Sequence, residues 1–216
     1  NHSPLLSHFA DKCRPLPYGI DIDYNENDQA EAQLIKEKYG RHKTLILAVG
    51  RLVYYKGLSY AVKAMTEVKA KLLIIGTGPE EKSLRQLIKN NNLEDKVTII
   101  SPQARLHPFF LAADIFLFPS TAKSEAFGLV QLEAMAAGKA IVNTYLQTSV
   151  EEVGQDGING LSVTPADSQA LARALNTLIS DPELRNNLGA KGQARYQQYY
   201  TLTHFRQPLQ EVLDII

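Results

Sequence analysis

The chain has 216 residues, enough to bury the core of one domain with additional segments, and its 23 basic and 23 acidic side chains cancel. That balance gives no sign of a protein that binds nucleic acid. The single cysteine, Cys13, excludes an internal disulfide and fits a reducing compartment, so we expect a cytoplasmic protein.

Predicted strands and helices alternate along the chain. Residues 1–22 are rich in proline and irregular. Continuous apolar runs predict strands over residues 44–49, 71–75, 96–100, 114–118, 140–143 and 160–163. Amphipathic patterns predict helices over residues 30–39, 60–68, 79–90, 107–112, 129–137, 167–180 and 182–200. This alternation predicts a three-layer α/β/α fold with a mostly parallel sheet covered on both faces.

Glycines and polar residues follow several of the predicted strands. They include Gly50-Arg51, Gly76-Thr77-Gly78, Ser101-Pro102-Gln103 and Pro119-Ser120. Ligands of open α/β sheets bind at the carboxyl ends of the strands. We therefore expect these turns to gather along one edge of the sheet and to form a binding site there.

The segment from Glu125 to Glu133 carries two carboxylates eight residues apart, with Gly128 three residues after the first. It lies between a predicted strand and a predicted helix. The start of a helix has unpaired N–H groups and a partial positive charge, which suit a phosphate, and Gly128 would let that phosphate approach the backbone. Glu133 lies roughly 7 Å along the helix. This spacing suits a diphosphate flanked by hydroxyl-bearing groups, as in a nucleotide sugar.

Residues 125–133 resemble the paired-glutamate motif of retaining glycosyltransferases with the GT-B fold, the glycosyltransferase 4 family. Three further segments match that family in order. Residues 17–21 resemble its interdomain segment, residues 49–57 its donor-phosphate motif, and residues 73–79 its strand-turn motif. The resemblance covers nearly the whole chain and implies a Rossmann-like, donor-binding half of a GT-B enzyme.

Arg51 and Lys56, with Gly50 and Gly57 beside them, are the basic residues of the donor-phosphate motif. The resemblance implies that they clamp the diphosphate and stabilise the charge on the leaving nucleoside diphosphate. The alternative is a pair of solvated surface cations. Together with Glu125 they are the predicted catalytic residues.

The resemblance also assigns the two glutamates. Glu133 is expected to accept hydrogen bonds from the ribose hydroxyls, and Glu125 to bind hydroxyls of the transferred sugar. We do not assign Glu125 as a nucleophile, because many such enzymes react without a covalent intermediate. The alternatives are an ordinary helix carboxylate and a loop carboxylate near a helix N-terminus. Backbone groups are expected to bind sugar and phosphate at Ala126, Phe127, Gly128 and Leu129, with the Phe127 side chain used for packing.

The nucleobase is expected beside residues 103–106, and Gly76 completes the predicted donor site. The base-binding segment consists of Gln103, Ala104, Arg105 and Leu106. Arg105 either reaches the base or phosphate or is an exposed cation. The segment does not reveal which base is bound.

Other site chemistries are missing from the sequence. Residues 76–81 lack the third glycine of a dinucleotide-binding G-x-G-x-x-G, and no P-loop pattern occurs. The five histidines lack metal-ligand spacing. We therefore expect no metal and no cofactor, with the nucleotide sugar as a substrate.

The resemblance implies three parts. Residues 1–22 are the interdomain segment, residues 23–200 the nucleotide-sugar-binding domain, and residues 201–216 a helix that crosses to a missing N-terminal domain. The apolar face of that helix, which would be exposed or would recruit a second copy, consists of Leu209, Val212, Leu213 and Ile216. The missing half would carry the acceptor site, so we expect this chain to bind donor but not to catalyse transfer.

We therefore predict the donor domain of a retaining hexosyltransferase of the mannosyl or rhamnosyl type. Its acceptor would be a saccharide or a lipid-linked saccharide in cell-envelope polysaccharide synthesis. The sequence has no run of about 18 apolar residues, so we expect no membrane span. The resemblance admits peripheral association of the whole protein with the inner face of the membrane. The alternatives are a nucleotide-sugar-binding module and a GT-B epimerase or phosphorylase, although the pyridoxal-lysine motif of a phosphorylase is absent.

Overall fold

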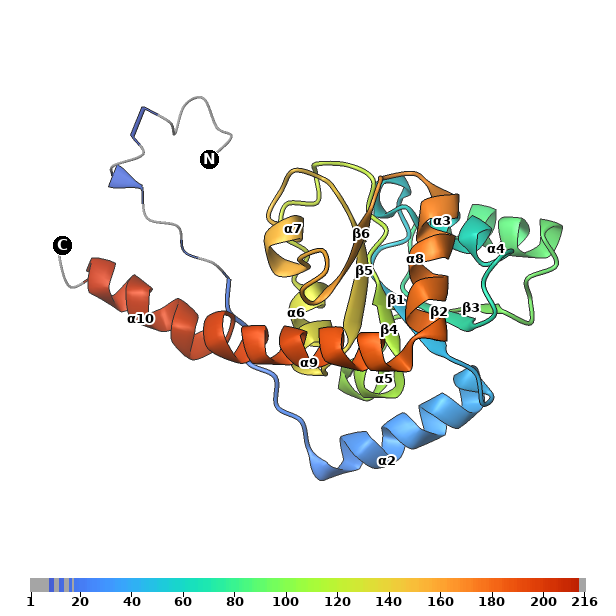
Figure 1. Cartoon of the computed structure of the whole chain (residues 1–216), viewed down its shortest axis with the longest axis horizontal. Helices are drawn as coiled ribbons and strands as arrows, with labels where there is room; N and C mark the ends of the chain where they lie inside the picture. Colours follow the sequence, from blue (N-terminus) through green and yellow to red (C-terminus); the bar gives the residue numbers. More distant parts are fainter. Residues whose placement is uncertain (1–7, 10–11, 14–15, 17, 214–216) are drawn as a thin grey trace.

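The fold is built on one six-stranded parallel sheet with the strand order β3-β2-β1-β4-β5-β6 (Figure 1). It is seen in a computed structural model that describes residues 8–9, 12–13, 16 and 18–213. The strands are β1 (Leu45–Val49), β2 (Lys71–Ile75), β3 (Val97–Ile100), β4 (Ile115–Leu117), β5 (Ala140–Thr144) and β6 (Gly160–Val163). All five pairings between neighbouring strands are parallel. The predicted three-layer α/β/α fold is confirmed.

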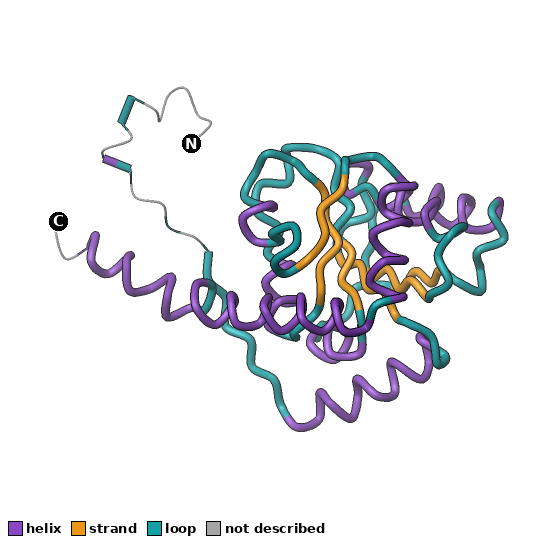
Figure 2. Tube along the Cα trace, viewed as in Figure 1, coloured by secondary structure: helices purple, strands orange, loops and turns teal. Residues whose placement is uncertain are grey.

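Helices cover both faces of the sheet, and the strands occupy the middle layer (Figure 2). One face packs against α3 (Leu58–Ala64), α4 (Glu81–Asn90) and α8 (Ser168–Ser180). The opposite face packs against α2 (Glu26–Ile35), α5 (His107–Ala112), α6 (Val130–Ala136) and α7 (Val150–Val153). Helix α9 (Pro182–Tyr199) contributes to both cores, with Leu188 in the first and Tyr196 in the second.

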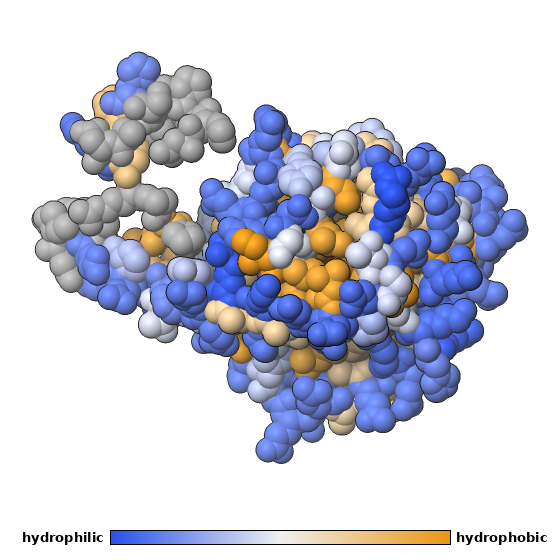
Figure 3. All heavy atoms as spheres, in the orientation of Figure 1, coloured by the Kyte–Doolittle hydropathy of each residue, from blue (hydrophilic) through white to orange (hydrophobic). Residues whose placement is uncertain are grey.

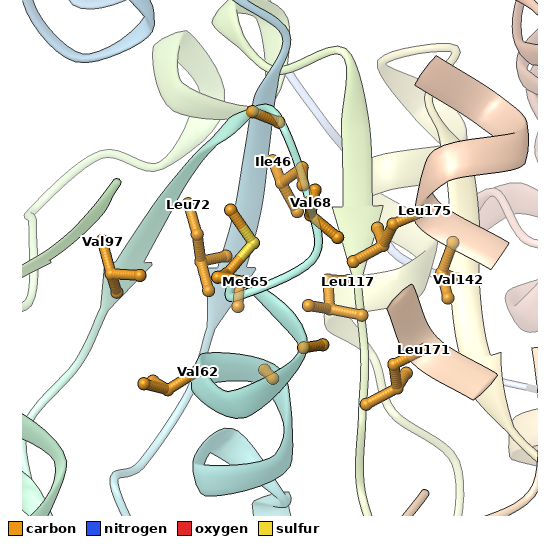
Figure 4. Packing of buried hydrophobic residues seen from close by; sticks show 14 of the residues in the cluster. Ile46, Val62, Met65, Val68, Leu72, Val97, Leu117, Val142, Leu171 and Leu175 are labelled. Atoms are coloured by element: carbon orange, nitrogen blue, oxygen red, sulfur yellow. The ribbon is translucent and has the colours of Figure 1, made fainter. Parts of the chain in front are cut away.

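The alternation of side chains along β1 shows how the two cores arise. Ile46 and Ala48 point into the core beneath α3, α4 and α8, whereas Leu45 and Leu47 point into the core on the other side. A strand alternates its side chains between two faces, so a continuous apolar run can fill both cores. Figure 4 shows the first core, where residues of α3 and α8 meet the strand side chains from opposite sides of the view.

The structure corrects the boundaries of two helices. Helix α2 begins at Glu26 rather than at residue 30, because Asn25 and Asp28 form a reciprocal capping box. Its last residues continue as a π-turn, Lys36–Gly40. Helix α3 ends at Ala64 rather than at residue 68, and turns lead from there to β2. The single-turn helix α7 and the 3₁₀ turn Tyr54–Lys56 were not predicted.

Helix α10 (Leu202–Leu213) follows α9 and projects beyond the body of the molecule (Figure 1). At its start, Ile20 forms a β-bridge with Thr201, and the Ile20 N–H donates to the Tyr200 carbonyl at 2.9 Å. Two leucines of the predicted apolar face are exposed, Leu209 at 37% and Leu213 at 55%. Ile216, Pro17 and most of residues 1–17 lie outside the described residues.

Hydrophilic residues cover most of the face shown in Figure 3, and hydrophobic atoms gather near its centre. No helix among the described residues is both long enough and apolar enough to cross a membrane.

Candidate functional site

The candidate site lies where the strand order reverses. Strand β1 pairs with β2 on one side and with β4 on the other, so the loops after β1 and β4 leave the same edge of the sheet. The Thr121 N–H donates to the Tyr55 carbonyl at 2.7 Å. A Cβ atom on Gly57 would lie 1.9 Å from the Pro119 carbonyl oxygen. The two loops therefore touch, and only glycine fits at position 57.

A cavity of about 170 Å³ opens at the ends of the first three strands. Gly76 permits the turns around it to approach, because a Cβ atom there would lie 1.9 Å from the Gly50 carbonyl oxygen. The lining combines backbone with apolar side chains: Val49, Gly50, Arg51, Ile75, Gly76, Thr77, Pro102, Gln103 and Leu106. The structure thus brings together five predicted site residues: Gly50, Arg51, Gly76, Gln103 and Leu106.

Lys56 and Glu125 form an ion pair between the two loops. Their side chains are only 16% and 12% exposed, so water screens this pair less than a surface pair. The Ser120 hydroxyl donates to Glu125 Oε2 at 3.1 Å, and this oxygen also accepts from Lys56 Nζ. Lys56 Nζ lies 5.1 Å from the centroid of the Phe118 ring. The two predicted residues therefore contact each other directly.

The loop after β5 holds the backbone of the Glu125 loop. The Thr148 hydroxyl donates to the Glu125 carbonyl at 3.0 Å, and the Ser149 N–H donates to the Ala126 carbonyl at 3.1 Å. Sequence reasoning placed Ser120 among the turns expected at this edge, but it did not assign Thr148 or Ser149 to the site. Their only signal was their place just after predicted strands, which does not show what they contact.

Gly128 and Phe127 shape the loop in different ways. Gly128 has φ of +75°, and a Cβ atom there would lie 2.7 Å from Phe118 Cζ, so no larger residue fits. The Phe127 ring packs edge-on against Tyr18 and Tyr200, with centroid distances of 5.3 and 6.3 Å. This confirms the packing role predicted for Phe127.

Glu133 lies on α6, and burial raises the pKa of its carboxyl to about 7. Burial, the neighbouring Tyr196 and the Glu133 charge together raise the pKa of the Tyr24 phenol. The Tyr24 ring lies 5.4 Å from the His107 ring. Glu133 is therefore a desolvated carboxylate whose ionised form would gain from hydrogen-bond donors on a ligand.

Arg105 and Ala104 do not line the cavity. Arg105 Nη2 donates to both carboxylate oxygens of Asp28, at 2.7 and 2.9 Å. Arg105 is also not a free surface cation, because its guanidinium pairs with Asp28, which is only 1% exposed. The sequence could not reveal this contact, since Arg105 lies in the loop after β3 and Asp28 lies on α2, far away in the chain.

Two cations lie at this edge of the sheet. Arg51 is exposed at the cavity, and Lys56 lies behind Gly50, with Nζ 3.9 Å from the position of a Cβ atom there. Among the described residues, no group of three or more His, Cys, Asp and Glu side chains is placed to hold a metal ion.

Several known proteins are similar to this chain over most of its length. The chain is 28% identical over 204 residues to O-antigen chain mannosyltransferase C of Escherichia coli, covering 94% of this chain and 54% of that protein. Anabaena HepE, crystallised with UDP-glucose, superposes with a TM-score of 0.80 at 26% identity, covering 89% of this chain and 54% of that one.

A third protein matches over almost its whole length. The C-terminal domain of the glycosyl transferase group 1 family protein LpcC from Francisella tularensis superposes with a TM-score of 0.71 at 28% identity. The alignment covers 87% of this chain and 97% of that domain. By contrast, the chain spans about half the length of the first two proteins.

The family description "Glycosyl transferases group 1" matches residues 30–195, which include every strand of the sheet and both site loops. The solved relatives share the GT-B architecture that the sequence motifs implied. The chain therefore belongs to the group 1 glycosyl transferases, a family of enzymes with members in polysaccharide and O-antigen synthesis.

Proposed function

We propose that this chain is the donor-binding domain of a retaining hexosyltransferase of the glycosyltransferase 4 family. The main support for this proposal is that the cavity at the ends of β1, β2 and β3 adjoins the partly buried Lys56–Glu125 pair. An apolar cavity suits a nucleobase, and cations beside it suit a diphosphate. The binding of UDP-glucose by Anabaena HepE supports a nucleoside-diphosphate sugar as donor.

Different residues bind different parts of the donor. The nucleobase enters the cavity beside Gln103 and Leu106, and Glu133 accepts hydrogen bonds from the ribose. Arg51 and Lys56 meet the diphosphate, and Glu125 binds hydroxyls of the hexosyl group. During transfer, the two cations stabilise the negative charge that develops on the leaving nucleoside diphosphate, so the site needs no metal or other cofactor.

The acceptor site belongs to another part of the whole protein. Residues 18–22 and the start of α10 lie side by side, and we propose that both lead to the acceptor-binding domain. Holding donor and acceptor together supplies much of the catalysis in reactions of this kind. The similarities to an O-antigen chain mannosyltransferase and to a transferase named for a diphospho-undecaprenol-linked substrate support a saccharide or lipid-linked acceptor in cell-envelope polysaccharide synthesis. We propose that transfer takes place on the cytoplasmic side of the membrane.

Calorimetric titration of the chain tests this proposal. The ligands are UDP, GDP and ADP, each compared with a matching sugar: UDP-glucose, GDP-mannose and ADP-glucose. One nucleotide series should bind, and the preferred base identifies the donor class. If none of the six ligands binds to the folded chain, the donor-domain assignment is wrong.

A further inference from the structure

We propose that Glu125 competes with the ligand for Lys56. In the structure the Glu125 carboxylate pairs with the Lys56 ammonium group that a diphosphate needs. This internal competition makes the site favour a nucleoside-diphosphate sugar over the free nucleoside diphosphate that remains after transfer. The inference rests on the proposed function and adds selectivity between substrate and product.

The groups around the Lys56 ammonium limit where an anionic ligand can contact it. Its ammonium group donates to Glu125 and lies 5.1 and 5.7 Å from the centroids of the Phe118 and Tyr55 rings. A ring face attracts a cation but cannot hold an anion. The side of the ammonium nearest the cavity is the side at Gly50. An anion that arrives from the cavity must therefore meet Lys56 beside the Glu125 carboxylate.

Glu125 cannot leave by a shift of its loop without breaking other contacts. Its carbonyl accepts from the Thr148 hydroxyl, and its N–H donates to the Ala122 carbonyl at 3.0 Å. The carboxylate is also held by the buried Ser120 hydroxyl. Only the side chain can turn away, and it turns at low cost only when other donors replace Lys56.

The two ligands differ in what they offer this carboxylate. The hexosyl group of a nucleotide sugar brings hydroxyl donors, which can replace Lys56 as partners of Glu125. A free nucleoside diphosphate brings no such donors, and its terminal phosphate carries more negative charge than the same phosphate esterified to a sugar. Glu125 then stays near the phosphate, and the two anions repel each other in a partly desolvated site.

The test uses Glu125→Gln, which removes the charge and keeps the side-chain shape. Dissociation constants for the nucleoside diphosphate and nucleotide sugar that the unmodified chain binds are measured by calorimetry. The free diphosphate should bind about fivefold more tightly to the variant, which is the upper end of the effect of one exposed ion pair. The nucleotide sugar should not gain, because it loses the Glu125 contact.

Two further variants complete the binding experiment. Glu125→Ala should also tighten the free diphosphate, which separates the loss of charge from any contact made by the new amide. Glu81→Gln is the control, since Glu81 pairs with Arg85 on the surface of α4 and its loss should change neither affinity. Thermal unfolding confirms that each variant is folded.

The outcomes distinguish the two proposals. If the unmodified chain binds but both Glu125 variants bind the free diphosphate no more tightly, internal competition is refuted and the donor-domain proposal stands. If the unmodified chain binds none of the nucleotides, both proposals fall together.

Discussion

Arg105 donates two hydrogen bonds from one guanidinium nitrogen to Asp28, at 2.7 and 2.9 Å, and so joins the loop after β3 to the start of α2. Asp28 also caps α2, accepting from the Asn25 N–H at 2.9 Å. One nearly buried carboxylate therefore serves both the helix and the loop that carries Gln103 and Leu106. Changes at Asp28 should affect stability first and ligand binding only through this loop.

Replacing Asp28 by alanine should lower the free energy of unfolding by about 1–3 kcal/mol, because it removes a helix cap and leaves Arg105 without its partner. Glu81→Ala, which breaks an exposed pair, should cost less than about 1 kcal/mol. Urea denaturation measures both. Equal costs for the two variants would show that the Asp28 contacts add nothing beyond a surface ion pair.

The contribution of Glu133 to the stability of the protein should fall as pH rises from about 4.5 to about 7, because burial raises the pKa of its carboxyl from 4.5 to about 7. Below this window the carboxyl is protonated in both folded and unfolded chains. Within it the unfolded chain loses the proton and the folded chain keeps it, so folding becomes less favourable. Glu133→Gln should be more stable than the unmodified chain at pH 8 by roughly 1–3 kcal/mol, and about equally stable at pH 4. A constant difference across this range, measured by denaturation, would contradict the shift.

Nucleotide binding should release protons near pH 7. If ribose hydroxyls donate to Glu133, they stabilise its ionised form and lower the raised pKa, so affinity should increase from pH 6 to pH 8. Calorimetry in buffers with different ionisation enthalpies counts the protons. Glu133→Gln should abolish the release; release that persists in this variant must come from another group.

Two glycines with nearly the same φ angle allow the cost of backbone strain to be measured separately from the cost of steric overlap. Gly57 and Gly157 have φ of 66° and 70°, but a Cβ atom on Gly57 would lie 1.9 Å from the Pro119 oxygen, whereas one on Gly157 would meet nothing within 4 Å. Gly157→Ala should cost about 1–2 kcal/mol, the penalty of the left-handed conformation alone. Gly57→Ala should cost roughly 1–3 kcal/mol more and should also weaken nucleotide binding by displacing Lys56. Denaturation and calorimetry on both variants compare them directly, and equal costs would show that the loops yield to the extra methyl group.

Replacing Arg51 and Lys56 together by alanine should remove two charge-assisted contacts, each worth about 1.5–3 kcal/mol, and so abolish measurable binding of the nucleotide. Lys82→Ala with Lys89→Ala, on α4, removes the same charge away from the proposed phosphate position. Calorimetry at two salt concentrations separates local contacts from a general charge effect. Similar losses in both double variants would refute the clamp.

Local patterns in the sequence determined the strands, the three-layer fold and the edge that carries the site. Continuous apolar runs such as residues 45–48 are visible in the sequence because both faces of a parallel strand are buried. Glycines at strand ends, such as Gly50 and Gly76, indicated the position of the cavity, because the need for glycine there arises from the local backbone. The start of α2 was missed although Asn25 and Asp28 stood in the sequence, because its first turn lacks the apolar period used to predict it.

Only the tertiary structure decided which side chains meet. The pairs Lys56–Glu125 and Arg105–Asp28 join residues far apart in the chain, and no spacing rule predicts such contacts. The hold of Thr148 on the Glu125 loop depends on β4 and β5 being neighbours. The raised pKa of Glu133 likewise needs a buried environment made by several elements. Periodicity and backbone requirements are properties of short segments, whereas partners and desolvation arise only when those segments pack.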